Sequence, residues 1–232
     1  MNKSPSKNPD KIREMFDSIA GRYDLLNRVL SLNIDQMWRE SMAQEAIGNR
    51  FLDVACGTGD VAESLARNHV NAQCFGIDFS RNMLINAREK TDSIHYVQGD
   101  ALELPVQDHE FTTISCAFGV RNFADRQRAF NEFYRILTAP GRVLILEFFP
   151  PEVRWYLKPY QFYLHHVLPR IGSWVSGSNQ AYHYLRDSVE AFCTRKEMAG
   201  ELKSAGFDKV EMKELTMGIS TLFIAEKKTS SE

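Results

Sequence analysis

The chain has few cysteines, and none of them form a pair with metal-binding spacing. Its four cysteines, Cys56, Cys74, Cys116 and Cys193, are scattered along 232 residues without a C-x-x-C motif. Structural zinc sites and disulfide frameworks need closely spaced or more numerous cysteines. We therefore expect no metal site and four free thiols in a reducing compartment.

The chain also lacks a strong charge of either sign and a long apolar run. Its formal net charge is −2, which disfavours nucleic acid as the main partner because nucleic-acid-binding surfaces are basic. No apolar stretch approaches the length of about eighteen residues that a membrane helix needs. The first ten residues, MNKSPSKNPD, do not resemble a signal peptide. These features predict a cytoplasmic protein, and the length fits one α/β domain with a sizeable core.

The segment FLDVACGTGD (residues 51–60) is the most informative part of the chain. It runs an apolar strand into a glycine turn and then into an amphipathic helix. Asp53 ends the apolar run, and Gly57 and Gly59 let a ligand approach the backbone because they carry no Cβ. Thr58 offers a hydroxyl near the helix start, where backbone N–H groups are unpaired. We therefore expect a small polar ligand at this turn.

Two further strands end in polar residues at the same edge of the predicted sheet. The apolar strand 74–77 is followed by Asp78, about twenty residues beyond the glycines, where a doubly wound sheet places a carboxylate that binds a ribose diol. The short strand 95–98 leads to Asp100 and Ala101, where an adenine can be recognised. Three successive strand ends thus point at one ligand, and Asp78 is predicted to hold its ribose.

Glycine-rich turns of this kind also bind dinucleotides, but the spacing disfavours that alternative. Gly57 and Gly59 are followed by Ala62, which matches only the permissive variant of the G-x-G-x-x-G pattern. The motifs DVACGTGD, GIDFS and QGDALELP instead resemble the first three motifs of the class I S-adenosylmethionine-dependent methyltransferases. This resemblance implies S-adenosyl-L-methionine as the methyl-donating cofactor.

Strand and helix signals alternate through the chain, which predicts a parallel sheet with crossover helices. Further expected elements are strands at 111–118 and 142–149, a helix between them that ends at Pro140 and Gly141, a helix at 197–205, and an antiparallel strand pair at 210–215 and 219–225. The fold class is therefore α/β: a Rossmann-like class I methyltransferase fold with a mostly parallel seven-stranded sheet. We expect an N-terminal helical cap (1–48), a cofactor-binding core (49–149), an inserted helical lid (150–193) and a closing helix and strands of the same domain (194–232).

The N-terminal segment carries a second and more specific resemblance. An apolar stripe at roughly helical spacing, which alone indicates only a packed cap, comprises Phe16, Ile19, Tyr23, Leu26 and Leu30. The string YDLLN (residues 23–27), with Ser31 and Trp38, resembles the signature of the quinone-biosynthesis C-methyltransferases, the demethylmenaquinone and 2-methoxy-6-polyprenyl-benzoquinol methyltransferase family. The blocks AFGVRNFADR, RILTAPGRVLILEFF, VLPRIGSWVSG, YHYL, AGF and LTMGI are also similar to that family. The resemblance therefore covers nearly the whole chain.

Several positions depart from the family pattern, but none of them removes an obvious catalytic group. Asp35 stands where a histidine is usual, residues 138–140 replace a Lys-Pro-Gly turn, Phe149 replaces a small hydroxyl residue, and Ala117 stands where some members have a serine. The cofactor contacts that the resemblance implies are Thr58, Asp78, Asp100 and Ala101, and the residue types themselves add Asp53 and Gly57. We do not include Ala117 among the cofactor contacts.

The resemblance implies methylation of a ring carbon of a polyprenylated quinol. A sulfonium methyl is already electrophilic, so the enzyme must align it and remove a phenolic proton beside the ring carbon. Only the reduced quinol has that proton, and the oxidised ring should be inert. We expect demethylmenaquinol as the acceptor, and 2-polyprenyl-6-methoxy-1,4-benzoquinol of ubiquinone biosynthesis is the alternative. A methyltransferase for another small molecule or a protein remains open, whereas a non-catalytic binding module is disfavoured by the intact cofactor motifs.

Arg121 and Asn122 are the leading candidates for the acceptor site, because they directly follow the fourth strand. The family resemblance places Arg121 in the substrate site, where a cation can steer a water or stabilise a phenolate but rarely takes a proton itself. The alternative is a structural arginine. Tyr23 is the third candidate, although its place on the apolar stripe favours packing. His165 and His166 lie among aromatic residues, as structural histidines usually do.

The segment from 153 to 186 contains no Asp or Glu. It holds the cations Arg154, Lys158, Arg170 and Arg186 among many aromatic residues, and from Pro159 it shows helical apolar spacing. The simpler interpretation is a lid helix packed on the sheet. The sharper interpretation is that this segment contacts anionic lipid and receives a polyprenyl tail. Such contact would place the protein at the inner face of the membrane. The sequence leaves the oligomeric state, including a homodimer, open.

Overall fold

The computed structural model describes residues 8–150 and 180–229. Most of the acid-free segment lies outside these residues, including the predicted helix from Pro159, the histidine pair and the cations Arg154, Lys158 and Arg170. No helix of the described part is long and apolar enough to cross a membrane.

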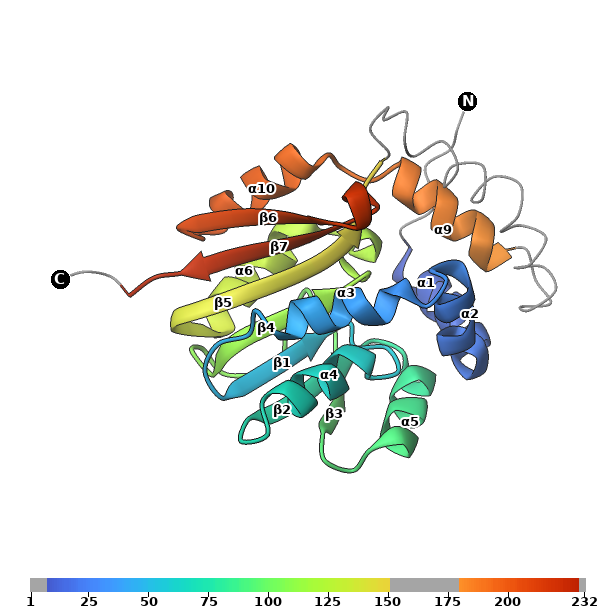
Figure 1. Ribbon diagram of the computed structural model, residues 1–232, viewed down its shortest axis with the longest axis horizontal. Coiled ribbons are helices and arrows are strands. Elements are labelled where there is room, and N and C mark those ends of the chain that lie inside the picture. The colour runs from blue at the N-terminus through green and yellow to red at the C-terminus, as the bar shows by residue number, and fades with distance from the viewer. Residues whose placement is uncertain (1–7, 151–179, 230–232) are drawn as a thin grey trace.

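A seven-stranded sheet with the order β3-β2-β1-β4-β5-β7-β6 forms the centre of the molecule (Figure 1). The strands are β1 Arg50–Val54, β2 Gln73–Asp78, β3 His95–Gln98, β4 Phe111–Ala117, β5 Leu137–Phe148, β6 Lys209–Leu215 and β7 Ser220–Lys227. β7 lies between β5 and β6 and pairs antiparallel with both, whereas β1 to β5 pair parallel. The predicted α/β fold with a mostly parallel sheet is confirmed.

Helices cover both faces of this sheet. The described helices are α1 Pro9–Ile19, α2 Tyr23–Leu30, α3 Ile34–Ala43, α4 Asp60–Asn68, α5 Arg81–Lys90, α6 Arg126–Ile136, α9 Gln180–Glu190 and α10 Arg195–Ser204, with short 3-10 turns η1 Ala20–Arg22, η2 Val120–Asn122 and η5 Thr216–Gly218. Met42 of α3 and Leu65 of α4 belong to one buried cluster, and Phe133 of α6 and Met198 of α10 belong to the other. Both clusters consist of apolar side chains with almost no exposed surface, so each face of the sheet has its own core.

The helix before β5 ends earlier than the sequence suggests. α6 ends at Ile136, and Leu137 already has an extended backbone with ψ of 134°. Pro140 and Gly141, which were predicted to end the helix, lie within β5 instead. The reason is tertiary: Leu137 is fully buried and pairs with Phe111 of β4, and this pairing overrides the breaker residues.

Helices α1, α2 and α9 gather at the end of the sheet where the parallel strands terminate (Figure 1). α1 begins with Asn8, whose side chain accepts hydrogen bonds from the backbone N–H groups of Asp10 and Lys11. α3 packs its Trp38 against Phe118 and Phe148, which follow β4 and end β5. The cap therefore covers the carboxyl edge, which is where α/β sheets bind their ligands.

Candidate active site

A pocket opens at the carboxyl edge of the sheet, between the strand ends and the N-terminal cap. It is lined by residues of β1, β2 and β4, by the turns that follow β1, β2 and β3, and by α1, α2, α5 and η2. The predicted site residues that line it are Tyr23, Gly57, Asp78, Asp100, Ala101 and Asn122. Ala117, which was not carried over from the family, lines it as well. Asp53, Thr58 and Arg121 are buried and are not among the lining residues.

Asp78 joins the two turns that form the floor of the pocket. Its Oδ2 accepts a hydrogen bond from the backbone N–H of Gly57 at 2.7 Å, and its Oδ1 accepts one from Ser80 at 2.8 Å. Burial raises the pKa of this carboxyl, and the two backbone N–H groups oppose the shift. Because each carboxylate oxygen has two lone pairs, both oxygens can still accept a hydrogen bond from a diol in the pocket.

The glycine turn has a conformation that only glycines adopt easily. Gly57 and Gly59 have φ of +56° and +87°. A Cβ on Gly59 would lie 2.2 Å from the hydroxyl of Tyr96, whereas a Cβ on Gly57 would meet only the Tyr23 ring at 3.6 Å. Gly59 is therefore required for packing, and Gly57 keeps the pocket side of the turn open.

Asp53 links β1 to β4 beneath the pocket. The hydroxyl of Ser115 donates to its Oδ1 at 2.6 Å, and its Oδ2 is buried without a hydrogen-bond partner among the described residues. Burial raises the pKa of Asp53 to about 7, against the hydrogen bond from Ser115. Near neutral pH the carboxyl of Asp53 is therefore partly protonated, and its Oδ2 remains available for a further hydrogen bond.

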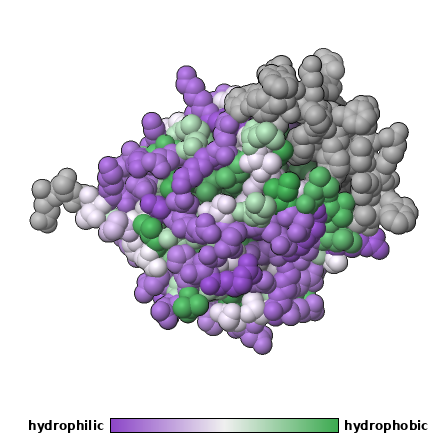
Figure 2. Space-filling model, in the orientation of Figure 1, coloured by the Kyte–Doolittle hydropathy of each residue, from purple (hydrophilic) through white to green (hydrophobic). Residues whose placement is uncertain are grey.

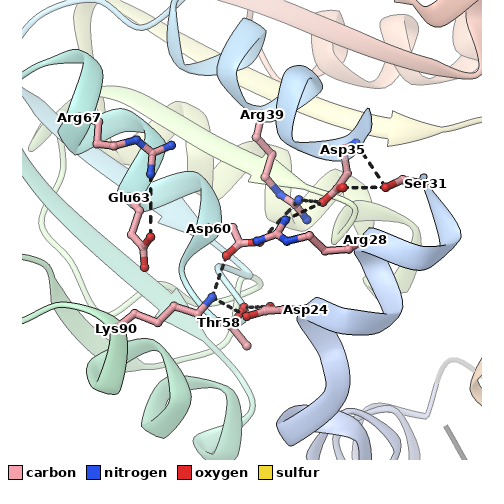
Figure 3. Close-up of polar contacts among 10 residues, drawn as sticks. All are labelled: Asp24, Arg28, Ser31, Asp35, Arg39, Thr58, Asp60, Glu63, Arg67 and Lys90. Atoms are coloured by element: carbon pink, nitrogen blue, oxygen red, sulfur yellow. Dashed lines mark hydrogen bonds and ion pairs between the residues drawn. The ribbon is translucent and has the colours of Figure 1, made fainter. Parts of the chain in front are cut away.

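Thr58 belongs to a polar network that fastens the cap to the core (Figure 3). Its hydroxyl donates to Oδ1 of Asp24 at 2.5 Å, and the other oxygen of Asp24 pairs with Lys90 at 2.6 Å. Lys90 also pairs with Asp60 at 2.7 Å, and Arg28 approaches Asp60 from α2. Burial would raise the pKa of Asp60, but Arg39, Lys90 and Arg28 outweigh it and the pKa is lowered.

These five residues, Asp24, Arg28, Thr58, Asp60 and Lys90, form the cap network. Its contacts join α2 to the first turn of α4 and to the end of α5. Tyr23 is the first residue of α2, and its ring lies 6.1 Å from that of Phe16 in an edge arrangement. The cap network thus holds a pocket-lining aromatic pair in place.

Asp35, which the sequence analysis above singled out, has its own partners between α2 and α3. The hydroxyl of Ser31 donates to Oδ1 at 2.6 Å, and Oδ2 pairs with Arg39 and with Arg28 at 3.4 Å. The side chain is buried, so the cations stabilise its charge. Asp35 therefore contributes to the connection of the cap helices.

Arg121 lies in η2, directly after β4, and pairs with the carboxylate of Glu147, which the sequence analysis did not single out. Its Nη1 donates to Glu147 at 2.6 Å and to the carbonyl of Phe118 at 2.7 Å. Glu147 is fully buried near the end of β5, and although burial raises its pKa, Arg121 opposes the shift. Nε of Arg121 is buried without a partner among the described residues, which leaves this donor unused.

Asn122 follows Arg121 in η2 and is bonded from outside the sheet. The hydroxyl of Tyr184, on α9, donates to its Oδ1 at 2.9 Å. Sequence reasoning missed both Glu147 and Tyr184. A lone acid in the apolar run RVLILEFF is a signal that could have revealed Glu147, whereas nothing near Tyr184 indicated its partner.

Comparison with known proteins gives one consistent family. Residues 4–227 match the model of the ubiE/COQ5 methyltransferase family. The demethylmenaquinone methyltransferase of Deinococcus radiodurans is 44% identical over 94% of this chain and 92% of its own length. The ubiquinone/menaquinone biosynthesis C-methyltransferase of Campylobacter jejuni is 37% identical over 94% of this chain and 98% of its own.

Solved structures agree with these relatives at the level of the fold. A SAM-dependent methyltransferase from Thermotoga maritima superposes with a TM-score of 0.66 at 17% identity, covering 93% of this chain and 99% of that one. The sheet order agrees with this fold, and the sequence matches show the family: the chain belongs to the ubiE/COQ5 methyltransferase family.

Proposed function

We propose that this protein transfers a methyl group from S-adenosyl-L-methionine to a ring carbon of a polyprenylated quinol. The observation that carries the proposal is that one pocket has two polar sides. Asp78 and Asp100 line it at the ends of β2 and β3, and Asn122 lines it after β4. Its relatives are named demethylmenaquinone methyltransferase and ubiquinone/menaquinone biosynthesis C-methyltransferase.

The residues of the first three strand ends fit the cofactor. Asp78 retains acceptor capacity for a ribose diol. The pocket that Asp100 lines is also lined by the apolar residues Phe79, Met83 and Leu102, which suit a flat adenine. Ala101 lines the same end, and Gly57 offers an open backbone. Thr58 and Asp53 do not line the pocket but support it. Thr58 does so through the cap network, and Asp53 by linking β1 to β4 beneath the pocket. The bound cofactor would supply an electrophilic methyl on its sulfonium.

The residues after β4 would handle the acceptor. Methylation needs the phenolic proton to leave, so negative charge develops on a ring oxygen near the transition state. Asn122 lines the pocket and can donate to that oxygen, while the buried guanidinium of the preceding Arg121 places a positive charge behind it that favours the developing phenolate. Tyr23 closes the cap side of the pocket and packs against the ligands.

Label transfer from methyl-labelled cofactor tests this function. The purified protein is incubated with demethylmenaquinol and with 2-polyprenyl-6-methoxy-1,4-benzoquinol, each in the reduced and the oxidised form. We expect the label on the reduced naphthoquinol first, the benzoquinol as the slower alternative, and none on either oxidised ring. Transfer to an oxidised ring, or to neither quinol, would contradict the proposal.

We also propose that the acid-free segment contacts anionic lipid at the membrane surface. Two observations support it: the cations Arg154 and Lys158 with their aromatic neighbours, and the exposed apolar side chains Leu25, Leu32 and Met37 of the cap. Figure 2 shows apolar surface over α2. A polyprenyl acceptor stays in the bilayer, so the enzyme must reach it there.

Charge reversal separates lipid binding from catalysis. Arg154→Glu with Lys158→Glu should weaken binding to anionic vesicles by about 1 kcal/mol per charge neutralised, and less at high salt. Turnover of a short-tailed soluble quinol should hardly change. Lys196→Glu with Lys203→Glu, at two exposed positions of α10, is the matched control. Equal losses in both assays would mean that the segment is a lid needed for turnover.

A further inference from the structure

Tyr184 connects helix α9 to the pocket through one side chain. Its hydroxyl donates to Oδ1 of Asn122 at 2.9 Å, although the two residues lie 62 positions apart. Asn122 lines the pocket, and Tyr184 is half-buried beside it. The bond therefore reaches a pocket residue from a helix that is not part of the strand-end framework.

The bond determines which end of the Asn122 amide remains available. An asparagine side chain has one acceptor oxygen and an NH₂ group with two donors. Because the oxygen accepts from Tyr184, the NH₂ group is left to donate to other groups. Without that bond the amide could rotate and present its oxygen instead, which would repel a developing phenolate.

The surroundings of Tyr184 keep its hydroxyl in the donor form. Burial raises the pKa of this phenol, as does the carboxylate of Glu147, and Arg121 lowers it. Because the net shift is upward, the hydroxyl carries its proton at neutral pH. Because Arg121 and Glu147 both affect the pKa of Tyr184, its hydroxyl lies within the electric field of that ion pair.

We propose that Tyr184 is a positioning residue of the acceptor site, which fixes the Asn122 amide so that its NH₂ group donates to the quinol oxygen that loses its proton. This inference rests on the proposed function and deepens it. Tyr184 acts through Asn122, so its contribution should be visible in turnover and absent when Asn122 cannot donate.

The test is a double-mutant cycle on turnover of reduced quinol, with cofactor affinity measured by calorimetric titration. Tyr184→Phe keeps the ring and removes the hydroxyl, so kcat should fall about tenfold. KM for the quinol and the Kd for cofactor should stay within twofold. Asn122→Ala should lower kcat about 100-fold, as loss of an oxyanion donor does. The double variant should be no slower than Asn122→Ala alone.

Two further variants sharpen the assignment. Asn122→Asp keeps an acceptor for Tyr184 but removes the donors, so it should be at least as slow as Asn122→Ala. Tyr134→Phe, whose ring packs on Phe207 away from the pocket, should retain wild-type turnover. Thermal melts of all variants check that each is folded.

The outcomes distinguish this inference from the function on which it rests. If the wild type labels reduced quinol and Tyr184→Phe keeps a kcat within twofold of wild type, the role of Tyr184 is overturned and the proposed function stands. Losses that multiply in the double variant would likewise mean that Tyr184 acts independently of Asn122. A wild type that labels no reduced quinol would overturn both.

Discussion

The two halves of the sheet's carboxyl edge use their polar side chains differently. At the ends of β2 and β3, Asp78 and Asp100 line the pocket, and the bonds of Asp78 come from backbone N–H groups of neighbouring turns. After β4 and near the end of β5, polar side chains also bond to one another: Arg121 to Glu147, and Tyr184 to Asn122. These bonds add to the backbone contacts of Arg121 with Phe118 and of Glu147 with Phe148.

We propose that the first half, at the ends of β2 and β3, binds the cofactor (the cofactor half), and that the second half, after β4 and near the end of β5, binds the acceptor (the acceptor half). The difference between them follows from what each half is proposed to hold. A cofactor with fixed chemistry can be bound by strand ends and turn backbone, whose positions the sheet already sets. A site that stabilises a charge appearing only during the reaction needs donors oriented in advance, away from bulk water. Buried charges of that kind require partners, and these partners come from distant parts of the chain.

The largest expected effect concerns the buried pair of the acceptor half. Glu147→Gln removes the charge that compensates Arg121, so the free energy of unfolding should fall by about 3 to 5 kcal/mol. Urea denaturation measures it. Glu201→Gln is the matched control, because it breaks the partly exposed pair with Arg126 and should cost about 1 kcal/mol or less. Equal losses would mean that the acceptor half is not held by its buried pair.

The next effect concerns the cofactor half. Asp78→Ala should weaken S-adenosylmethionine binding by about 2 to 4 kcal/mol, because a charged acceptor for the ribose diol is lost. Calorimetric titration compares it with Asp92→Ala, which changes an exposed aspartate of the loop before β3. Unchanged affinity in a folded Asp78→Ala variant would remove Asp78 from the cofactor site.

Per unit of pH, a smaller effect is expected at the border between the halves, where Asp53 joins β1 to β4. The pKa of Asp53 is about 7 in the folded protein against 3.8 for the ordinary carboxyl. Between these values the folded state binds more protons than the unfolded state, so wild-type stability falls as the pH rises. Asp53→Asn lacks this loss. Its stability relative to wild type should therefore increase from about pH 4 to pH 7, by at most about 1.4 kcal/mol per pH unit.

Urea denaturation at several pH values measures that difference, with Asp92→Asn as the control for an exposed carboxyl. A difference that stays constant over this range would mean that Asp53 titrates normally.

The cofactor half could be predicted from the sequence because it is built locally. The strand predicted at 95–98 is β3, Asp78 ends β2, Asp100 lies two residues after β3, and both aspartates line the pocket. Each of these features depends on a strand and the turn directly after it. The helix end at Pro140 was wrong because pairing between distant strands outweighed a local breaker signal.

The acceptor half could be predicted only in part, because its contacts join residues far apart in sequence. Arg121 and Asn122 follow β4 and could be named from that position alone. Their partners Glu147 and Tyr184 lie 26 and 62 residues away. Thr58 shows the same limit, since its partner Asp24 belongs to the cap, 34 residues earlier. One-dimensional spacing carries no information about such pairs.

The most direct test of the two-part edge is to measure cofactor affinity and turnover together in an Arg121→Leu/Glu147→Leu double variant. Replacing both members of a buried pair by apolar residues avoids an unpaired charge, so the protein should fold and melt cooperatively. We predict a Kd for S-adenosylmethionine within twofold of wild type and turnover of reduced quinol that is lower by about 100- to 1000-fold. A folded double variant that retains turnover within threefold of wild type would contradict the account and make Arg121 purely structural.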